Sequence, residues 1–159
     1  CRPHFFLGVT TVVSKLLIQT MADLAIFGEK DYQQLQIIRR MAQDLDIPTE
    51  IVEGPTIREE DGLAMSSRNR YLNDIERLSA GKLYASICDV ASAVKAGLPH
   101  DKACAEAINS LVDGGFNKID YFTVRDAETL QHYRGKCRPG RVLAAAWLGR
   151  ARLIDNVAV

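Results

Sequence analysis

The chain has 159 residues, of which 47% are hydrophobic and 25% charged, and its 20 basic and 20 acidic side chains give a formal net charge of zero. This balance argues against non-specific electrostatic binding to nucleic acid or to an anionic membrane. No apolar run approaches the length that spans a bilayer and no signal-peptide pattern is present, so we expect no membrane partner and a cytoplasmic protein. The four cysteines form no C-x-x-C pair and no His stands at ligand spacing from them, so no protein-held metal site is predicted.

The first third of the sequence predicts a strand–helix–strand unit. Residues 8–19 have apolar side chains at the spacing of an amphipathic helix, which outweighs their β-branched content. An apolar run at 24–27 is typical of a short buried strand, a helical pattern follows at 32–45, and 49–52 is a plausible next strand. A strand followed by a helix and a second strand indicates parallel βαβ organisation.

Pro55 marks the expected domain boundary, which divides the chain into residues 1–55 and 56–159. Beyond it the sequence becomes a charged loop. Asn73 with Glu76 has the spacing of a capping box, so we predict one long helix from there to about residue 96. Asp101 is expected to cap another helix, which ends at the glycines of positions 114–115.

The last third of the sequence predicts strands. Residues 119–124 are expected as a strand. Residues 142–147 form a continuous apolar run, which predicts a central strand and places Trp147 in the core. Residues 153–155 are expected as a short edge strand. Helices and strands that segregate in this way are typical of a small α+β domain.

The first candidate site is the turn Gly28-Glu29-Lys30-Asp31, which follows the strand predicted at 24–27. In open α/β sheets, ligands bind at the carboxyl ends of strands, and a helix N-terminus at that edge offers N–H groups to an anion. Lys30 adds a mobile positive charge suited to phosphate. On spacing alone, Lys30 could equally be a solvated lysine, and Asp31 with Gln34 could simply form a capping box.

The second candidate site is the loop Asp61-Gly62-Leu63-Ala64-Met65-Ser66-Ser67-Arg68-Asn69-Arg70-Tyr71-Leu72, called here the serine–arginine loop. It places two hydroxyls beside a guanidinium, which can bind phosphate through two parallel hydrogen bonds. The alternative is an ordinary polar interdomain loop, with Ile57 and Met65 in ordinary packing. Together the two sites indicate a nucleotide-phosphate site made of two separate pieces.

Both motifs, at this spacing, closely resemble the pantothenate synthetase (pantoate–β-alanine ligase) family, and the likeness continues through residues 145–149 and 151–156. The resemblance implies that residues 1–55 are the C-terminal part of a doubly wound, Rossmann-like domain of the nucleotidyltransferase superfamily. Residues 56–159 would be a small α+β lid domain. It also implies an ATP-dependent condensation of pantoate and β-alanine to pantothenate through a pantoyl-adenylate, with release of AMP and pyrophosphate. Mg²⁺ would accompany the ATP phosphates, and the complete protein would be a homodimer.

The resemblance also implies a role for each motif residue. Lys30 and Arg68 would act in catalysis, and Gln34 would bind pantoate. The ATP contacts would be Gly28, Glu29, Lys30, Asp31, Ile57, Met65, Ser66, Ser67 and Arg68. Near the N-terminus the pattern departs from the family, because Phe5 and Leu7 stand where the family has His and Arg.

The family's His-x-x-His motif, which binds the ATP phosphates, has no counterpart here, since the histidines are His4, His100 and His132. We therefore expect a fragment that is inactive by itself. Two other functions stay open: a module that binds ATP without chemistry, and a structural relative whose phosphate motif has become idle.

Overall fold

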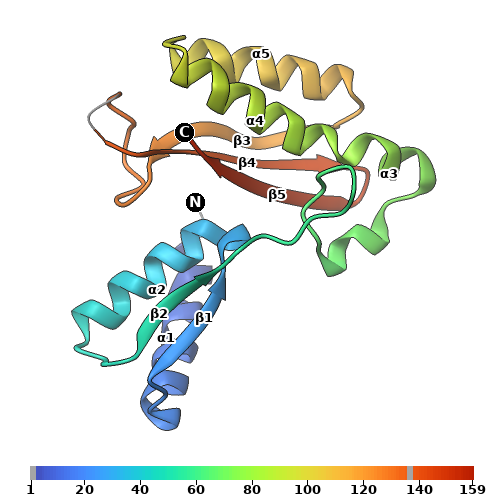
Figure 1. Cartoon of the computed structure of the whole chain (residues 1–159). Helices are drawn as coiled ribbons and strands as arrows, with labels where there is room; N and C mark the ends of the chain where they lie inside the picture. The colour runs from blue at the N-terminus through green and yellow to red at the C-terminus, as the bar shows by residue number, and fades with distance from the viewer. Residues whose placement is uncertain (1–2, 136–137) are drawn as a thin grey trace. The chain divides into compact units, whose positions relative to one another are not determined.

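Two compact units make up the chain, Cys1–Thr56 (unit 1) and Ile57–Val159 (unit 2) (Figure 1). The computed structural model describes residues 3–135 and 138–159. Unit 1 has a parallel sheet and unit 2 an antiparallel one, so the fold is mixed α/β. Among the described residues, no helix is both long and apolar enough to cross a membrane.

Unit 1 is a strand–helix–strand unit preceded by a long helix. Its elements are α1 (Pro3–Thr20), β1 (Leu24–Gly28), the 3₁₀ turn η1 (Glu29–Asp31), α2 (Tyr32–Asp44) and β2 (Glu50–Gly54). β1 and β2 pair in parallel, from Leu24 opposite Glu50 to Gly28 opposite Gly54. The expected helix at 8–19 and the expected parallel βαβ organisation are both confirmed.

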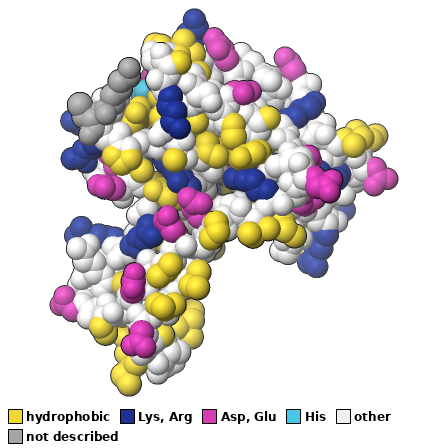
Figure 2. Space-filling model, viewed as in Figure 1, with side chains coloured by type: hydrophobic (Ala, Val, Ile, Leu, Met, Phe, Trp, Pro, Cys, Tyr) yellow, Lys and Arg dark blue, Asp and Glu magenta, His cyan; other side chains and the backbone are white. Residues whose placement is uncertain are grey.

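The core of unit 1 is small. Leu17 of α1 packs with Ile38 and Met41 of α2, and Ala25 and Phe27 of β1 lie against this cluster. Because side chains alternate along a strand, Leu24 and Ile26 point the other way and are exposed. The prediction of a buried strand at 24–27 was therefore wrong for one of its two faces, and Figure 2 shows hydrophobic side chains on the surface of this unit.

Unit 2 is a three-stranded antiparallel sheet in the order β3–β4–β5, with helices α4 and α5 on one face (Figure 1). Its elements are the 3₁₀ turn η2 (Ser67–Tyr71), α3 (Asp74–Ala80), α4 (Lys82–Lys95), α5 (His100–Asp113), β3 (Lys118–Asp126), β4 (Gly140–Leu148) and β5 (Ala151–Ala158). The expected central strand is confirmed, because β4 pairs with both neighbours: its Ala144 lies opposite Phe122 and Asp155.

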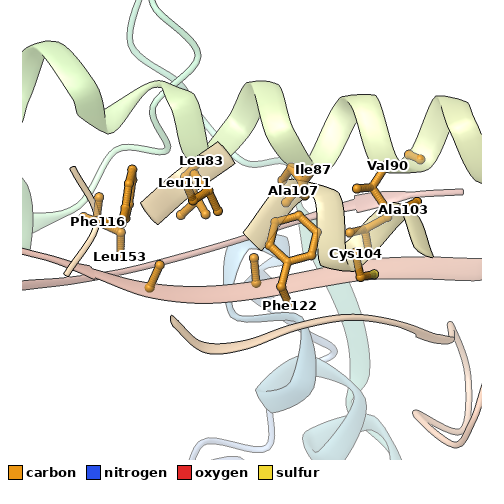
Figure 3. Packing of buried hydrophobic residues seen from close by; sticks show 14 of the residues in the cluster. Leu83, Ile87, Val90, Ala103, Cys104, Ala107, Leu111, Phe116, Phe122 and Leu153 are labelled. Atoms are coloured by element: carbon orange, nitrogen blue, oxygen red, sulfur yellow. The ribbon is translucent and has the colours of Figure 1, made fainter. Parts of the chain in front are cut away.

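The core of unit 2 lies between these helices and the sheet (Figure 3). Leu83, Ile87 and Val90 recur on one face of α4, at the spacing that places them on a single apolar stripe. They meet Leu111 of α5 and Phe122 of β3, and small alanines of β4 let the helices approach the sheet closely. This larger core is the scaffold on which the serine–arginine loop is mounted.

The long helix predicted from Asn73 to about residue 96 is in fact two helices, α3 and α4, which meet at Gly81. The capping box that opens α3 is confirmed, since the Asn73 and Glu76 side chains each bond the other's backbone N–H. A Cβ on Gly81 would lie 2.8 Å from the carbonyl oxygen of Asp61. The serine–arginine loop thus approaches the junction of the two helices closely, and only glycine leaves room for it there.

Two smaller predictions were also wrong, and an expected edge strand is confirmed but longer than predicted. Helix α5 begins at His100 after Pro99, and Asp101 lies inside its first turn, so no side chain caps it. The short strand expected at 153–155 is the eight-residue edge strand β5, because its whole length pairs with β4. Trp147 is only half-buried, and its Nε1–H donates to Asp120 at 3.1 Å.

Candidate functional site

The Gly28–Asp31 turn lies at the carboxyl end of the parallel pair and runs directly into α2. Gly28 ends β1 opposite Gly54, which ends β2, so both strands finish at the same edge. Glu29 and Lys30 are half-buried, whereas Asp31 is exposed, and Gln34 follows in the first turn of α2. This is the place where a parallel sheet and a helix N-terminus together can receive an anion.

The capping box predicted for Asp31 and Gln34 is absent from this helix start. Asp31 occupies the N-cap position, but its side chain makes no capping hydrogen bond. The reason is the 3₁₀ turn before it, which gives Asp31 φ −92° and ψ 53° instead of the extended conformation that a capping side chain requires. Asp31 and Gln34 therefore do not form a capping box at this helix start.

The serine–arginine loop begins in a tight hairpin. The amide of Met65 donates to the Ile57 carbonyl at 2.9 Å, and the amide of Glu59 donates to the Leu63 carbonyl at 2.8 Å. Gly62 turns the chain with φ +86°, and a Cβ there would lie 2.2 Å from the Tyr84 ring. Only glycine meets both conditions. The hairpin brings Ile57 and Met65, both predicted ATP contacts, side by side.

Ser66, Ser67 and Arg68 follow on the turn η2. The Ser66 hydroxyl oxygen accepts the Arg68 amide at 3.2 Å, so Ser66 caps this turn. A hydroxyl that accepts in this way still has its own proton to donate. Ser67 and Arg68 are exposed, as is Met65. The structure thus gathers Gly28–Asp31 and Gln34 in unit 1, and Ile57 and 65–68 in unit 2.

A buried ion pair anchors the hairpin to the sheet. Arg58 donates to both carboxylate oxygens of Asp155 on β5, at 2.6 and 3.0 Å, and also to the Gly62 carbonyl. Its guanidinium carbon lies 3.8 Å from the centroid of the Tyr84 ring. Burial lowers the pKa of Arg58, but the hydrogen bonds and charge of Asp155 outweigh burial and leave that pKa raised.

A second cluster joins the hairpin to α3 and η2. Arg77 pairs with Glu59 and with Asp61, and Glu59 in turn accepts the Asn69 amide at 2.8 Å. The hydrogen bond from Arg77 lowers the pKa of Asp61, and the same bond raises the pKa of Arg77. The Asp61–Arg77 pair thus stays charged at neutral pH, where it holds the loop against α3.

Sequence reasoning did not assign roles to these anchoring residues. Arg58 and Glu59 lie in the charged loop that follows Pro55, and Asp155 lies within the C-terminal likeness at 151–156, but neither pattern indicates a partner. The pairing of positions 58 and 155 depends on β5 lying beside the hairpin, which no local pattern reveals. The signal that the sequence offered for the anchoring role was that these charged residues had no ligand assigned to them.

The N-terminal departure from the family pattern lies on α1. Phe5 and Leu7 are exposed there, and the Phe5 ring packs edge-on against Phe6 with their centroids 5.3 Å apart. Arg2 lies outside the described residues. Within the described ranges, no three His, Cys, Asp or Glu side chains gather where they could hold a metal ion.

A family model described as pantoate-beta-alanine ligase matches residues 1–158 of the chain. The chain belongs to the pantoate–β-alanine ligase family. A pantothenate synthetase of this family from Mesorhizobium japonicum is 53% identical over 158 residues, and one from Caulobacter vibrioides is 53% identical over 162 residues. Each comparison covers 99% of this chain, which spans 56% of the length of either relative.

Solved structures of the pantoate–β-alanine ligase family share this fold. A pantothenate synthetase from Thermus thermophilus superposes with a TM-score of 0.82 and 39% identity, over 94% of this chain and 54% of that one. A second structure is a pantoate-beta-alanine ligase from Francisella tularensis, complexed with beta-gamma ATP and β-alanine. It superposes with a TM-score of 0.70 and 32% identity, over 94% of this chain and 49% of that one.

Proposed function

We propose that this chain takes part in the ATP-dependent condensation of pantoate and β-alanine to pantothenate. The pantoate carboxylate would attack the α-phosphorus of ATP and expel pyrophosphate, and the amine of β-alanine would then displace AMP from the pantoyl-adenylate. The observation that carries the proposal is the match of a pantoate–β-alanine ligase model to residues 1–158, with both motifs intact within it. The ATP and β-alanine complex of the Francisella tularensis relative supports the same substrates.

In unit 1, we assign Lys30 to neutralising the charge of the ATP phosphates and Gln34 to binding pantoate. The position of Gly28–Asp31 at the carboxyl end of β1 supports an ATP contact there, because backbone N–H groups at a helix start favour anions. A glutamine amide both donates and accepts hydrogen bonds, which suits the hydroxyls and carboxylate of pantoate. We further propose that β1, α2 and β2 belong to a Rossmann-like nucleotide-binding sheet.

In unit 2, we assign Ser66, Ser67 and Arg68 to the triphosphate, with Ile57 and Met65 as further ATP contacts. Exposure of Ser67 and Arg68 on an anchored turn supports this role. These groups would stabilise charge as pyrophosphate leaves, so no protein nucleophile is required. Unit 2 would act as a lid that excludes water from the acyl-adenylate.

We propose that Mg²⁺ arrives with the ATP phosphates. The described part of the chain offers no cluster of metal-binding side chains, and Mg²⁺ in enzymes that use ATP is commonly held by substrate phosphates together with few protein ligands. The complete enzyme is proposed to be a homodimer, on the family resemblance alone.

The test is AMP formation with ATP, Mg²⁺, pantoate and β-alanine, omitting each substrate in turn. Two proteins are assayed: the 159-residue chain, and a chimaera in which these residues replace the matching part of the Mesorhizobium japonicum relative. We expect AMP from the chimaera only when pantoate and β-alanine are both present. A folded chimaera that makes no AMP, while the unmodified relative does, would contradict the proposal. ATP binding without AMP would point to the non-catalytic module.

A further inference from the structure

The side chain of Asn69 ties together the two ends of the segment that presents Ser67 and Arg68. Its Nδ2 group donates to the carbonyl oxygen of Ala64 at 3.2 Å and to Oε1 of Glu59 at 2.8 Å. Ala64 immediately precedes residues 65–68, and Asn69 immediately follows them. The amide of Asn69 also donates to the Ser66 carbonyl at 3.0 Å, which closes the turn a second time.

The orientation of the Asn69 amide is fixed by its neighbours. Both of its contacts are acceptors, so the donor end of the amide must face them. The other end, Oδ1, is buried and has no hydrogen-bond partner among the described residues. Reversing the amide would place an oxygen against the Glu59 carboxylate and the Ala64 carbonyl, which is repulsive. Asn69 therefore holds the turn in one conformation.

The acceptor of Asn69 is itself held in place. The Oε2 atom of Glu59 accepts from Arg77 at 2.5 Å, and Arg77 on α3 also pairs with Asp61. A continuous chain of contacts thus runs from α3 through Arg77 and Glu59 to Asn69. It ends one residue from Arg68, whose side chain is exposed.

We propose that Asn69 is the positioning residue of the triphosphate-binding turn. This inference rests on the proposed function, in which Arg68 contacts the triphosphate. Asn69 would act through Ser67 and Arg68, by holding them where phosphate charge develops. A misplacement of about 1 Å at such a group can cost on the order of 100-fold in rate, so an anchor of this kind affects catalysis directly.

The experiment compares Asn69→Asp and Asn69→Ala with Glu59→Gln and a control, Asn109→Ala. Asn69→Asp keeps the shape of the side chain but removes both donated hydrogen bonds. Glu59→Gln leaves one acceptor oxygen where the carboxylate has two, so the side chain can no longer accept from both Asn69 and Arg77. Asn109 is an exposed asparagine on α5, distant in sequence from the serine–arginine loop.

The first readout is amide hydrogen exchange in the 159-residue chain. We expect both Asn69 variants and Glu59→Gln to speed exchange in residues 65–72 and to leave α4 and α5 unchanged, while Asn109→Ala matches the unsubstituted chain. Exchange at 65–72 that stays unchanged in both Asn69 variants would overturn the proposal. General loss of protection would show a structural role only and would also overturn it.

The second readout is kcat and KM for ATP in the chimaera. We expect kcat/KM for ATP to fall by a factor on the order of 10 to 100 in both Asn69 variants and to fall in Glu59→Gln as well, with a near-normal value for Asn109→Ala. Faster exchange with unchanged kinetics would overturn the catalytic part of the inference. If the unsubstituted chimaera made no AMP, the proposed function would fail, and the exchange data would still decide whether Asn69 holds the turn.

Discussion

Arg68 lies exposed on η2, and a change at this position removes a positive charge without opening the core. In the chimaera, Arg68→Ala should lower the rate of AMP formation by about 100- to 1,000-fold, because a charged donor to the departing pyrophosphate is lost. The free energy of unfolding should change by less than about 0.5 kcal/mol. Steady-state kinetics and urea unfolding check the two parts. The control for loss of charge is Lys102→Ala, which replaces an exposed lysine on α5. Near-normal AMP formation by Arg68→Ala would remove Arg68 from the mechanism.

Arg58 and Asp155 form an ion pair in which the Asp155 side chain is only 3% exposed. Arg58→Met should lower the free energy of unfolding by roughly 3–5 kcal/mol, because it leaves a buried carboxylate without its partner. Asp155→Asn in the same chain should recover part of this loss, since the uncompensated charge is then gone. Chemical denaturation of the single and double variants measures both effects. A double variant as unstable as the sum of two independent losses would contradict the pairing.

Helix α3 begins with a complete capping box, and at seven residues it is short. Asn73→Ala should lower the free energy of unfolding of unit 2 by about 0.5–2 kcal/mol, because the Glu76 amide loses its acceptor. Thermal unfolding followed by circular dichroism checks this. Asn109→Ala on α5 replaces an exposed helical asparagine outside any cap and should leave the midpoint nearly unchanged. Equal losses in both variants would argue against the cap.

The three strands of unit 2 share a surface cluster centred on Asp120 of β3. Arg152 of β5 donates to its carboxylate at 2.7 Å, and Trp147 of β4 donates to it at 3.1 Å. Hydrogen bonds, from Arg152 foremost, hold the pKa of Asp120 at about 2. An unfolded aspartate titrates near about 3.9, so the folded state binds this proton less readily.

The lowered pKa of Asp120 gives a pH dependence of known sign. The stabilisation is fully present above about pH 4 and is lost as the pH falls toward about 2, because the unfolded chain then takes up the proton first. Asp120→Asn should therefore flatten the dependence of unfolding free energy on pH in this window. Denaturation at a series of pH values measures the slope. An unaltered slope in Asp120→Asn would contradict the assignment.

At the scale of the whole molecule, the two units differ in the size of their cores. Among the described residues, the core cluster of unit 1 has three buried residues, Leu17, Ile38 and Met41, beside a two-stranded sheet, whereas the core cluster of unit 2 has twenty. A two-stranded sheet is marginally stable unless helices cover it. We expect backbone amides of β1 and β2 to exchange with solvent faster than those of α4, α5 and β4.

Hydrogen exchange followed by mass spectrometry tests this difference in the 159-residue chain. Leu111→Ala, at a fully buried position of α5, should raise exchange across unit 2, and Ile38→Ala should raise it in unit 1. Equal protection of both units in the unsubstituted chain would show that they unfold together. It would then contradict the expectation drawn from their separate cores.

The sequence by itself determined most of the pattern of elements and the family resemblance of the two motifs. Periodicity placed α1, α2 and the central strand β4, and the Asn73–Glu76 spacing placed the start of α3, because these signals depend on neighbours along the chain. The motifs at 28–31 and 61–72 are visible in the sequence, and the family model confirms their resemblance to pantoate–β-alanine ligases. Site roles for Lys30, Gln34 and Arg68 stay predictions.

Only the tertiary structure decided how the serine–arginine loop is held. Gly81, between α3 and α4, stands where a Cβ would clash with Asp61, and Gly62 is required because Tyr84 lies over it. The Arg58–Asp155 pair joins residues 97 positions apart. Such contacts depend on where β5 and α4 lie in space, and a local sequence pattern does not contain that information. The sequence therefore specified which groups could bind phosphate, while the fold specified what keeps them in place.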